Sequence, residues 1–179
     1  RSDRNSHIRM DHPRSHFRID MELDGTRTAL EVKGDSCRLE YQGKTDFSAE
    51  TAQEHKLNCD RARMWRDYYT YLYGLPMKLR DPGTLVSETV LKRRFKGSEY
   101  LVLEVRYDPD TGSDTWYFYF DPATYALGAY QFFHDPEAND GEYILLEGEM
   151  EIGGIRMPQS RSWYPNAGEE FLGTDRIVE

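Results

Sequence analysis

The chain has 179 residues, of which 38% are hydrophobic and 13% aromatic, and its net charge is −9. Such a chain is too apolar to be disordered, its length favours a single domain over residues 1–179, and its negative charge excludes a nucleic-acid partner. No apolar run approaches the ~20 residues of a membrane helix, so we expect no transmembrane segment.

The sequence starts at Arg1 without an initiator methionine and continues through a polar stretch. We interpret residues 1–6 as a loose, trimmed N-terminus. On this interpretation, a signal peptide or a lipid anchor could have preceded Arg1 in the precursor.

The first predicted strand covers residues 16–23, where apolar and polar side chains alternate strictly. This alternation is typical of a strand with one buried face. Two turn sequences, Asp24-Gly25 and Gly34-Asp35, separate it from two further strands. The three strands predict an antiparallel meander.

The middle of the chain changes to a helical period. Residues 46–73 contain neither proline nor glycine, and Asp46 or Ser48 can cap the start of a helix. Gly74 and Pro76 should end it. We therefore predict one principal helix. Its apolar stripe consists of Met64, Trp65, Tyr68, Tyr69 and Leu72.

The rest of the chain returns to strands separated by glycine, proline and aspartate turns. The expected strands cover residues 86–95, 100–107, 115–120, 125–133, 142–152, 155–164 and 171–178. Short connections favour pairing between sequence neighbours. The predicted fold class is mainly β with one principal helix (α+β), with a curved antiparallel sheet forming an unclosed barrel around the helix.

The two cysteines, Cys37 and Cys59, are either buried free thiols or a disulfide. Their spacing suits neither a zinc site nor a redox pair. Cys37 lies in the third predicted strand, and Cys59 lies in the segment that leads into the helix packed on that sheet. We therefore favour a disulfide, which would indicate an oxidising compartment.

No standard catalytic or nucleotide-binding signature is found in the sequence. Asp108, Asp110 and Asp114 alternate around Gly112 and could converge on a hard cation. The loop has no glycine directly after its third candidate ligand and lacks the distal glutamate of a calcium loop, so we interpret it as a hairpin turn. We expect no metal, no cofactor and no enzymatic activity; a metal-assisted hydrolase using the acidic loops is the alternative.

A set of large apolar side chains could either line a cavity or fill the core. The set comprises Trp65, Tyr69, Leu72, Trp116, Phe118, Tyr130 and Phe132. A cavity would predict binding of a lipid or another apolar ligand. A filled core would instead predict a structural or interaction protein.

Four segments together resemble a known family. They are residues 37–47, 64–84, 112–133 and 139–149. From about His16 to the C-terminus the chain resembles a family of uncharacterised bacterial envelope proteins, a domain of unknown function.

The fold of such proteins is similar to that of the carriers of outer-membrane lipoprotein sorting (LolA-like), an unclosed antiparallel barrel around a helix. In those carriers the concave apolar face receives acyl chains. The resemblance implies a location in the cell envelope, either in the periplasm or anchored to the outer membrane. It also implies a non-enzymatic protein that binds a lipid or acyl chain in a half-barrel groove.

Overall fold

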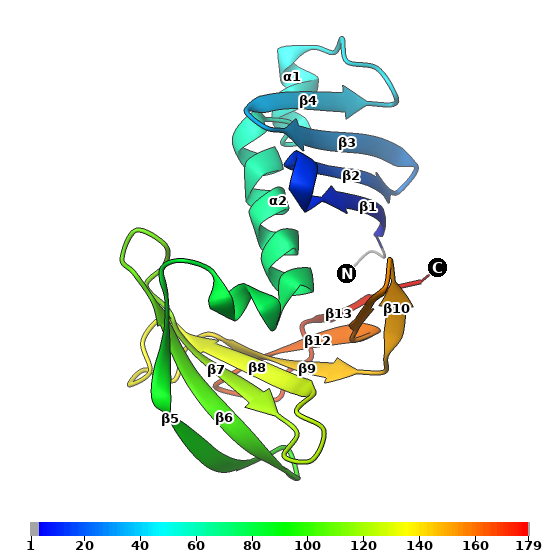
Figure 1. Ribbon diagram of the computed structural model, residues 1–179. Coiled ribbons are helices and arrows are strands. Elements are labelled where there is room, and N and C mark those ends of the chain that lie inside the picture. Colours follow the sequence, from blue (N-terminus) through cyan, green and yellow to red (C-terminus); the bar gives the residue numbers. More distant parts are fainter. Residues whose placement is uncertain (1–3, 179) are drawn as a thin grey trace. The chain divides into compact units, whose positions relative to one another are not determined.

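The computed structural model describes residues 4–178, which form two compact units that divide after Leu75 (Figure 1). The predicted fold class is confirmed: the chain is mainly β with one principal helix, and its sheets are antiparallel and not closed into a barrel. Each unit has its own sheet. The single LolA-like domain over residues 1–179 stays a prediction.

The N-terminal unit contains a four-stranded meander in which each strand pairs antiparallel with the next. Its strands are β1 (Asn5–Asp11), β2 (His16–Leu23), β3 (Thr26–Lys33) and β4 (Ser36–Tyr41). A short 3₁₀ turn, η1 (His12–Arg14), connects β1 to β2.

Strand β1 corrects the prediction for the N-terminus. Asn5 and Ser6, which we expected in a loose segment, pair with Glu22 and Met21 of β2. The free edge of β2 supplies backbone partners that a polar sequence alone does not reveal. Residues 1–3 of the predicted loose segment lie outside the described residues.

The predicted helical segment forms two helices, α1 (Ala49–Glu54) and α2 (Cys59–Gly74). Ser48 caps α1 by accepting from the Thr51 amide, whereas Asn58 caps α2. Lys56, with φ of 53°, interrupts the helical backbone between them. The principal helix ends at Gly74, as predicted.

Helix α2 packs on the apolar face of the four-stranded sheet (Figure 1). The buried core consists of Phe17, Ile19, Leu30, Val32, Leu57, Ala62 and Tyr69, with Trp65 packed against it. The strand residues of this core alternate along β2 and β3, as the sequence predicted. Leu72 is buried as well.

A disulfide joins Cys37 in β4 to Cys59 in the first turn of α2, and the two Cα atoms are 5.8 Å apart. The sequence favoured this pairing. The bond links the sheet to the helix that covers it.

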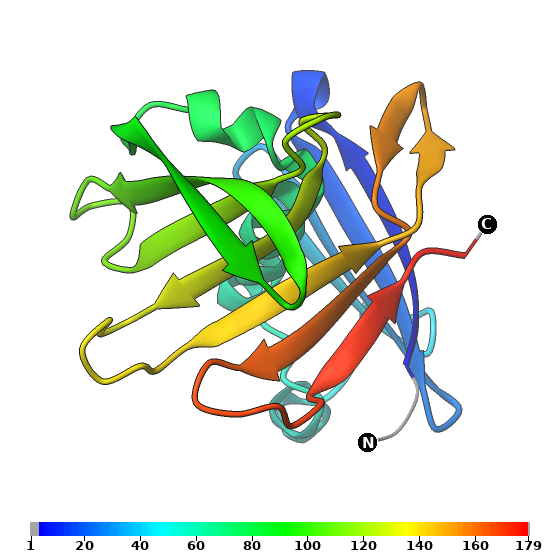
Figure 2. The ribbon, with the colours of Figure 1, turned by 90° about the horizontal axis from the view of Figure 1, so that it is seen from below.

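The C-terminal unit contains a curved seven-stranded sheet in the order β13-β12-β9-β8-β7-β6-β5 (Figure 2). Its strands are β5 (Thr84–Phe95), β6 (Ser98–Tyr107), β7 (Thr115–Phe120), β8 (Leu127–Phe133), β9 (Glu142–Glu147), β12 (Ser160–Pro165) and β13 (Gly173–Arg176). A 3₁₀ turn, η2 (Met77–Arg80), precedes β5.

Two predicted strands, 142–152 and 155–164, are each divided in the structure. Their inner halves, β10 (Met150–Ile152) and β11 (Ile155–Met157), pair with each other as a separate two-stranded hairpin. Gly148, with φ of 68°, lies between β9 and β10 and turns the chain out of the large sheet.

A chain of polar side chains inside the C-terminal unit fixes the loop after β8. Tyr119 donates to the amide oxygen of Gln131 at 2.7 Å, and Gln131 donates to Asn166 at 3.0 Å. The Asn166 amide donates in turn to the carbonyl oxygens of Phe132 and Asp140. These bonds hold both ends of the loop that carries His134.

Candidate functional site

Four of the predicted ligand-binding residues form one surface, which we call the aromatic face: Trp116, Phe118, Tyr130 and Phe132. Trp116 lies opposite Phe132, and Phe118 lies opposite Tyr130, on neighbouring strands β7 and β8. The Trp116 and Phe132 ring centroids are 4.9 Å apart, and those of Phe118 and Tyr130 are 6.1 Å apart. Phe118 and Tyr130 are buried, whereas Trp116 and Phe132 are half-buried. The four rings therefore form one continuous apolar cluster, and only its Trp116–Phe132 end is partly accessible to solvent.

The other three predicted residues, Trp65, Tyr69 and Leu72, belong to α2 in the N-terminal unit. Trp65 stacks on Tyr69 with ring centroids 5.3 Å apart. Tyr69 also stacks on Phe17 of β2. Within their own unit, Trp65 and Tyr69 thus help to fill the space between helix and sheet. A single cavity lined by all seven predicted residues stays a prediction.

The acidic loop of residues 108–114 forms a turn. The carbonyl oxygen of Asp108 accepts from the Thr111 and Gly112 amides, at 2.7 and 3.1 Å. The side chain of Asp114 contacts His134. Across residues 4–178, no three His, Cys, Asp or Glu side chains gather in a group that could hold a metal ion. The candidates Asp108, Asp110 and Asp114 are therefore not brought together as ligands.

His134 and Asp114 form an ion pair at the partly open end of the aromatic face. The imidazole Nδ1 lies 2.8 Å from a carboxylate oxygen of Asp114, and the imidazole ring meets Phe132 edge-on. The hydrogen bond to Asp114 raises the pKa of His134, and the nearby charges of Asp140 and Glu142 act in the same direction. A charged group thus borders the apolar surface.

This pair leads to a testable prediction. Replacing Asp114 with asparagine should move the pKa of His134 down toward the ordinary histidine value of about 6.5, because the carboxylate that favours the protonated imidazole is lost. NMR titration of the imidazole protons measures the change. His55, which stacks on Tyr41 in the other unit, serves as the internal control and should not shift. An unchanged His134 titration would contradict the ion pair.

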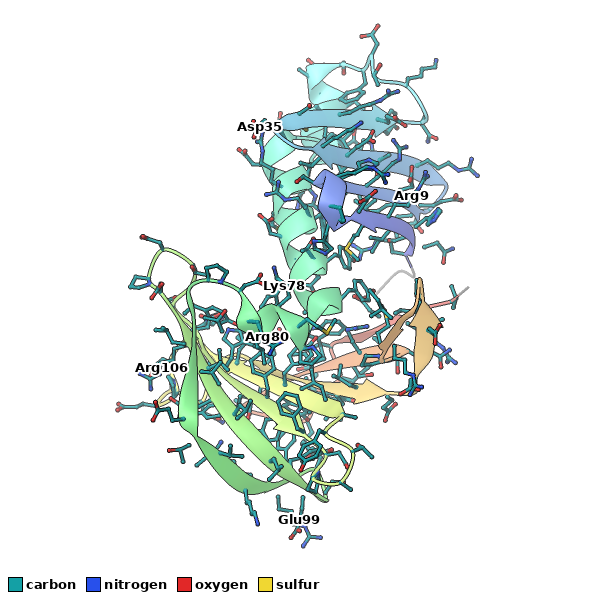
Figure 3. All side chains as sticks on the ribbon, viewed as in Figure 1. Arg9, Asp35, Lys78, Arg80, Glu99 and Arg106 are labelled. Carbon is teal, nitrogen blue, oxygen red and sulfur yellow. A yellow bond between two sulfur atoms is a disulfide. The ribbon has the colours of Figure 1, made fainter. Side chains whose placement is uncertain are left out.

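A second arrangement, on the solvent side of the four-stranded sheet, was not predicted from the sequence. We call this surface the charged face; Arg9 extends from it, on the side away from α2 (Figure 3). At its centre the guanidinium of Arg18 binds Asp20 at 2.6 Å, Glu40 at 3.0 Å and Glu31 at 3.4 Å. The Arg18 side chain is only 17% exposed and that of Glu40 only 13%.

The Arg18 guanidinium determines how the carboxyl groups around it ionise. Its hydrogen bonds lower the pKa of Asp20 and of Glu40, and this effect outweighs the partial burial of the two groups, which acts in the opposite direction. The same bonds raise the pKa of Arg18. All three groups therefore stay charged at neutral pH.

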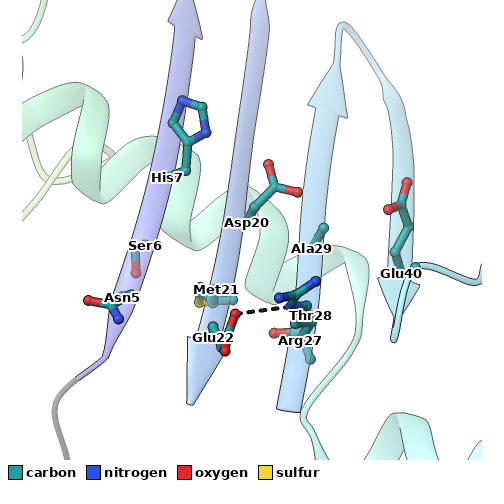
Figure 4. Close-up of a pocket in the computed structure, with 11 residues that line it drawn as sticks. Asn5, Ser6, His7, Asp20, Met21, Glu22, Arg27, Thr28, Ala29 and Glu40 are labelled. Atoms are coloured by element: carbon teal, nitrogen blue, oxygen red, sulfur yellow. Dashed lines mark hydrogen bonds and ion pairs between the residues drawn. The ribbon is translucent and has the colours of Figure 1, made fainter. Parts of the chain in front are cut away.

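A hollow of about 380 Å³ lies on the charged face, at the end of the sheet where β2 passes into β3 (Figure 4). Asp20, Ala29 and Glu40 stand in one row across the strands, and the short side chain of Ala29 leaves the space between the two carboxylates. The lining includes Asn5, His7, Asp20, Glu22, Arg27 and Glu40.

The carboxylates of this hollow already have guanidinium partners. Arg18 holds Asp20 and Glu40, and Arg27 binds Glu22 at 2.9 Å. A ligand would have to compete with these internal ion pairs. The only sequence signal for this surface is the alternation of charged residues along β2 and β3, and alternation does not say which charges face one another.

The comparison with known families covers every residue of the chain. The family of unknown function DUF6503 matches residues 1–179. The chain belongs to this family. The match supports the resemblance to a domain of unknown function that the sequence segments indicated. No curated protein matches the chain. No solved structure matches it.

In the part of the chain that the structure describes, none of the helices combines the length and the apolar character needed to cross a bilayer.

Proposed function

We propose that this member of DUF6503 is a non-enzymatic protein of the cell envelope that binds a lipid or another apolar ligand on the aromatic face. A half-barrel similar to the LolA-like carriers is part of the proposal. The observation that carries it is the continuous surface of Trp116, Phe118, Tyr130 and Phe132, whose rings contact one another across two strands. Apolar ligands are held on such surfaces, with few polar groups at the border.

The chemistry of this surface favours an acyl chain. Aromatic rings offer large, rigid contact areas without hydrogen-bond donors at their faces, and a flexible chain can follow a row of them. The His134–Asp114 pair at the end of the row supplies a polar group for the other end of an amphiphilic ligand.

The disulfide supports a location outside the cytoplasm. Cys37 and Cys59 are bonded to each other, and such bonds persist in oxidising compartments such as the bacterial periplasm. Mass determination of the protein from its native membrane fraction, without reductant, tests this part of the proposal. Two free thiols there would contradict it.

The test of ligand binding uses the double variant Trp116→Ser/Phe132→Ser. Titration with a fluorescent fatty-acid analogue should show at least about tenfold weaker binding than for the unchanged protein, since each lost aromatic contact of this kind costs more than about 1 kcal/mol. Tyr125→Ser is the control, because Tyr125 is 69% exposed in the turn before β8. Native mass spectrometry of the purified protein identifies any ligand that remains bound.

Two outcomes would reject the proposal. The unchanged protein could fail to bind the analogue, or the control could lose binding as strongly as the double variant. If the double variant loses several kcal/mol of stability and no ligand binds the unchanged protein, the aromatic face is filled core. In that case the alternative of a structural or interaction protein is correct.

A further inference from the structure

The β10–β11 hairpin is a small amphipathic ribbon. It forms a two-stranded sheet of its own and projects from the large sheet of the C-terminal unit (Figures 1 and 2). The pairs Met150–Met157 and Ile152–Ile155 lie on one face, because residues that pair across strands share a side. The opposite face carries the Glu151–Arg156 pair. Arg156 also reaches Glu149 at 3.7 Å.

The apolar end of this ribbon lies open to solvent. Ile152 is 44% exposed and Ile155 is 48% exposed, on either side of the Gly153-Gly154 turn. A Cβ atom at either glycine would have no atom beyond the adjacent residues within 4 Å. An isolated two-stranded hairpin is marginally stable in water, and exposed apolar side chains at its tip do nothing to stabilise it. The exposure of the two isoleucines is explained if the hairpin tip enters an apolar environment outside the protein.

We infer that the hairpin tip inserts into the surface of a lipid bilayer with uncharged (zwitterionic) headgroups. Its reach fits: strands of three residues, rising about 3.3 Å per residue, span about 10 Å. Apolar groups of interfacial anchors lie roughly 5–10 Å into the boundary between headgroups and acyl chains. The ion-paired residues on the other face can then stay in water or among the headgroups.

Size and charge favour a bilayer over a protein partner. Two isoleucines at a convex tip offer far less than the roughly 800 Å² per partner of a specific protein interface. The turn between the two isoleucines, Gly153-Gly154, carries no side chain that would orient a protein partner. The hairpin carries Glu149 and Glu151 against a single Arg156, and the chain as a whole has a net charge of −9. Anionic lipid headgroups would therefore repel it.

The experiment is flotation of the full chain with phosphatidylcholine vesicles. The unchanged protein should float with the vesicles, and Ile152→Ser/Ile155→Ser should lower the partition coefficient at least about tenfold. The matched control is Leu85→Ser/Val90→Ser, which removes two side chains of similar exposure, 54% and 53%, from β5 in the same unit. Adding phosphatidylglycerol should weaken flotation, and Glu149→Gln/Glu151→Gln should restore part of it.

Three results would overturn the inference: no flotation of the unchanged protein, equal loss in the tip variant and the β5 control, or a tip variant that changes the oligomeric state in sedimentation and leaves flotation intact. Circular dichroism checks that the tip variant is folded. We expect it to be, because among residues 4–178 the hairpin pairs with no strand of another sheet. The inference does not depend on the proposed ligand. Trp116→Ser/Phe132→Ser should lose the fatty-acid analogue and still float.

Discussion

Replacing both Cys37 and Cys59 with serine is expected to lower the free energy of unfolding of the N-terminal unit by roughly 3 kcal/mol. The bond closes a segment with a sequence separation of 22 residues that contains the whole of α1. Without it, the unfolded chain gains the conformational freedom of an open loop, and α2 loses its disulfide cross-link to β4. We expect this to be one of the two largest stability changes in that unit.

Hydrogen exchange of the amides of β2 and β3 during a urea series measures the loss in this unit. Strands β2 and β3 carry the core residues Phe17, Ile19, Leu30 and Val32. Reductant added to the unchanged protein should reproduce the effect of the double variant, and the variant itself should not respond to reductant. Equal exchange with and without the bond would show that the disulfide does not stabilise the unit.

Arg18→Met should destabilise the N-terminal unit by about 2 kcal/mol at pH 7. The change leaves Asp20, Glu31 and Glu40 close together without the guanidinium that now binds all three. The value is below that for a fully buried pair, because the Asp20 side chain is 35% exposed and solvent screens its charge. Urea unfolding at constant salt measures the difference.

The pH dependence of this variant has a definite sign. Arg18 lowers the pKa of Asp20 and of Glu40 in the folded protein. Their contribution to stability is therefore present above the unfolded-state pKa values of about 4 and is lost as the pH falls through the lower folded values. The stability difference between the unchanged protein and Arg18→Met should shrink below about pH 4.

Arg27→Met is the matched control for Arg18→Met. Arg27 lies on the same face of the sheet and binds Glu22, but its side chain is 73% exposed. An exposed ion pair of this kind contributes at most about 1 kcal/mol. If both variants lose the same stability, or if the Arg18 variant keeps its full deficit at pH 3, the proposed role of the Arg18 network is wrong.

Local signals in the sequence were enough to locate most of the secondary structure. The strand predicted over residues 115–120 agrees with β7 at both ends, and the principal helix ends at Gly74 as predicted. These signals are the alternation of apolar side chains and the presence of glycine or proline at an element's boundary. Each determines the backbone conformation of residues only a few positions away. The disulfide could also be predicted, because its two cysteines lie in a strand and a helix that had to pack together.

Other features depend on partners far along the chain. Strand β1 forms because β2 offers a free edge, and its own sequence gives little sign of it. Arg18 binds Glu40, which lies 22 residues away in the sequence. Asp114 contacts His134, which lies 20 residues away. The aromatic residues at 116 and 132 meet because β7 and β8 pair in one particular register. Alternation predicts the face on which a side chain lies, but it does not predict its neighbours across the strands.

By itself, the sequence determined the fold class and the approximate element boundaries, because periodicity and turn residues are local properties of the chain. It also determined the family, because the DUF6503 model matches residues 1–179. The tertiary structure alone decided the division of the strands among separate sheets, the charged face around Arg18 and the isolated β10–β11 hairpin. These depend on strand pairing over long sequence distances, where the free energy comes from contacts between residues that no local pattern connects.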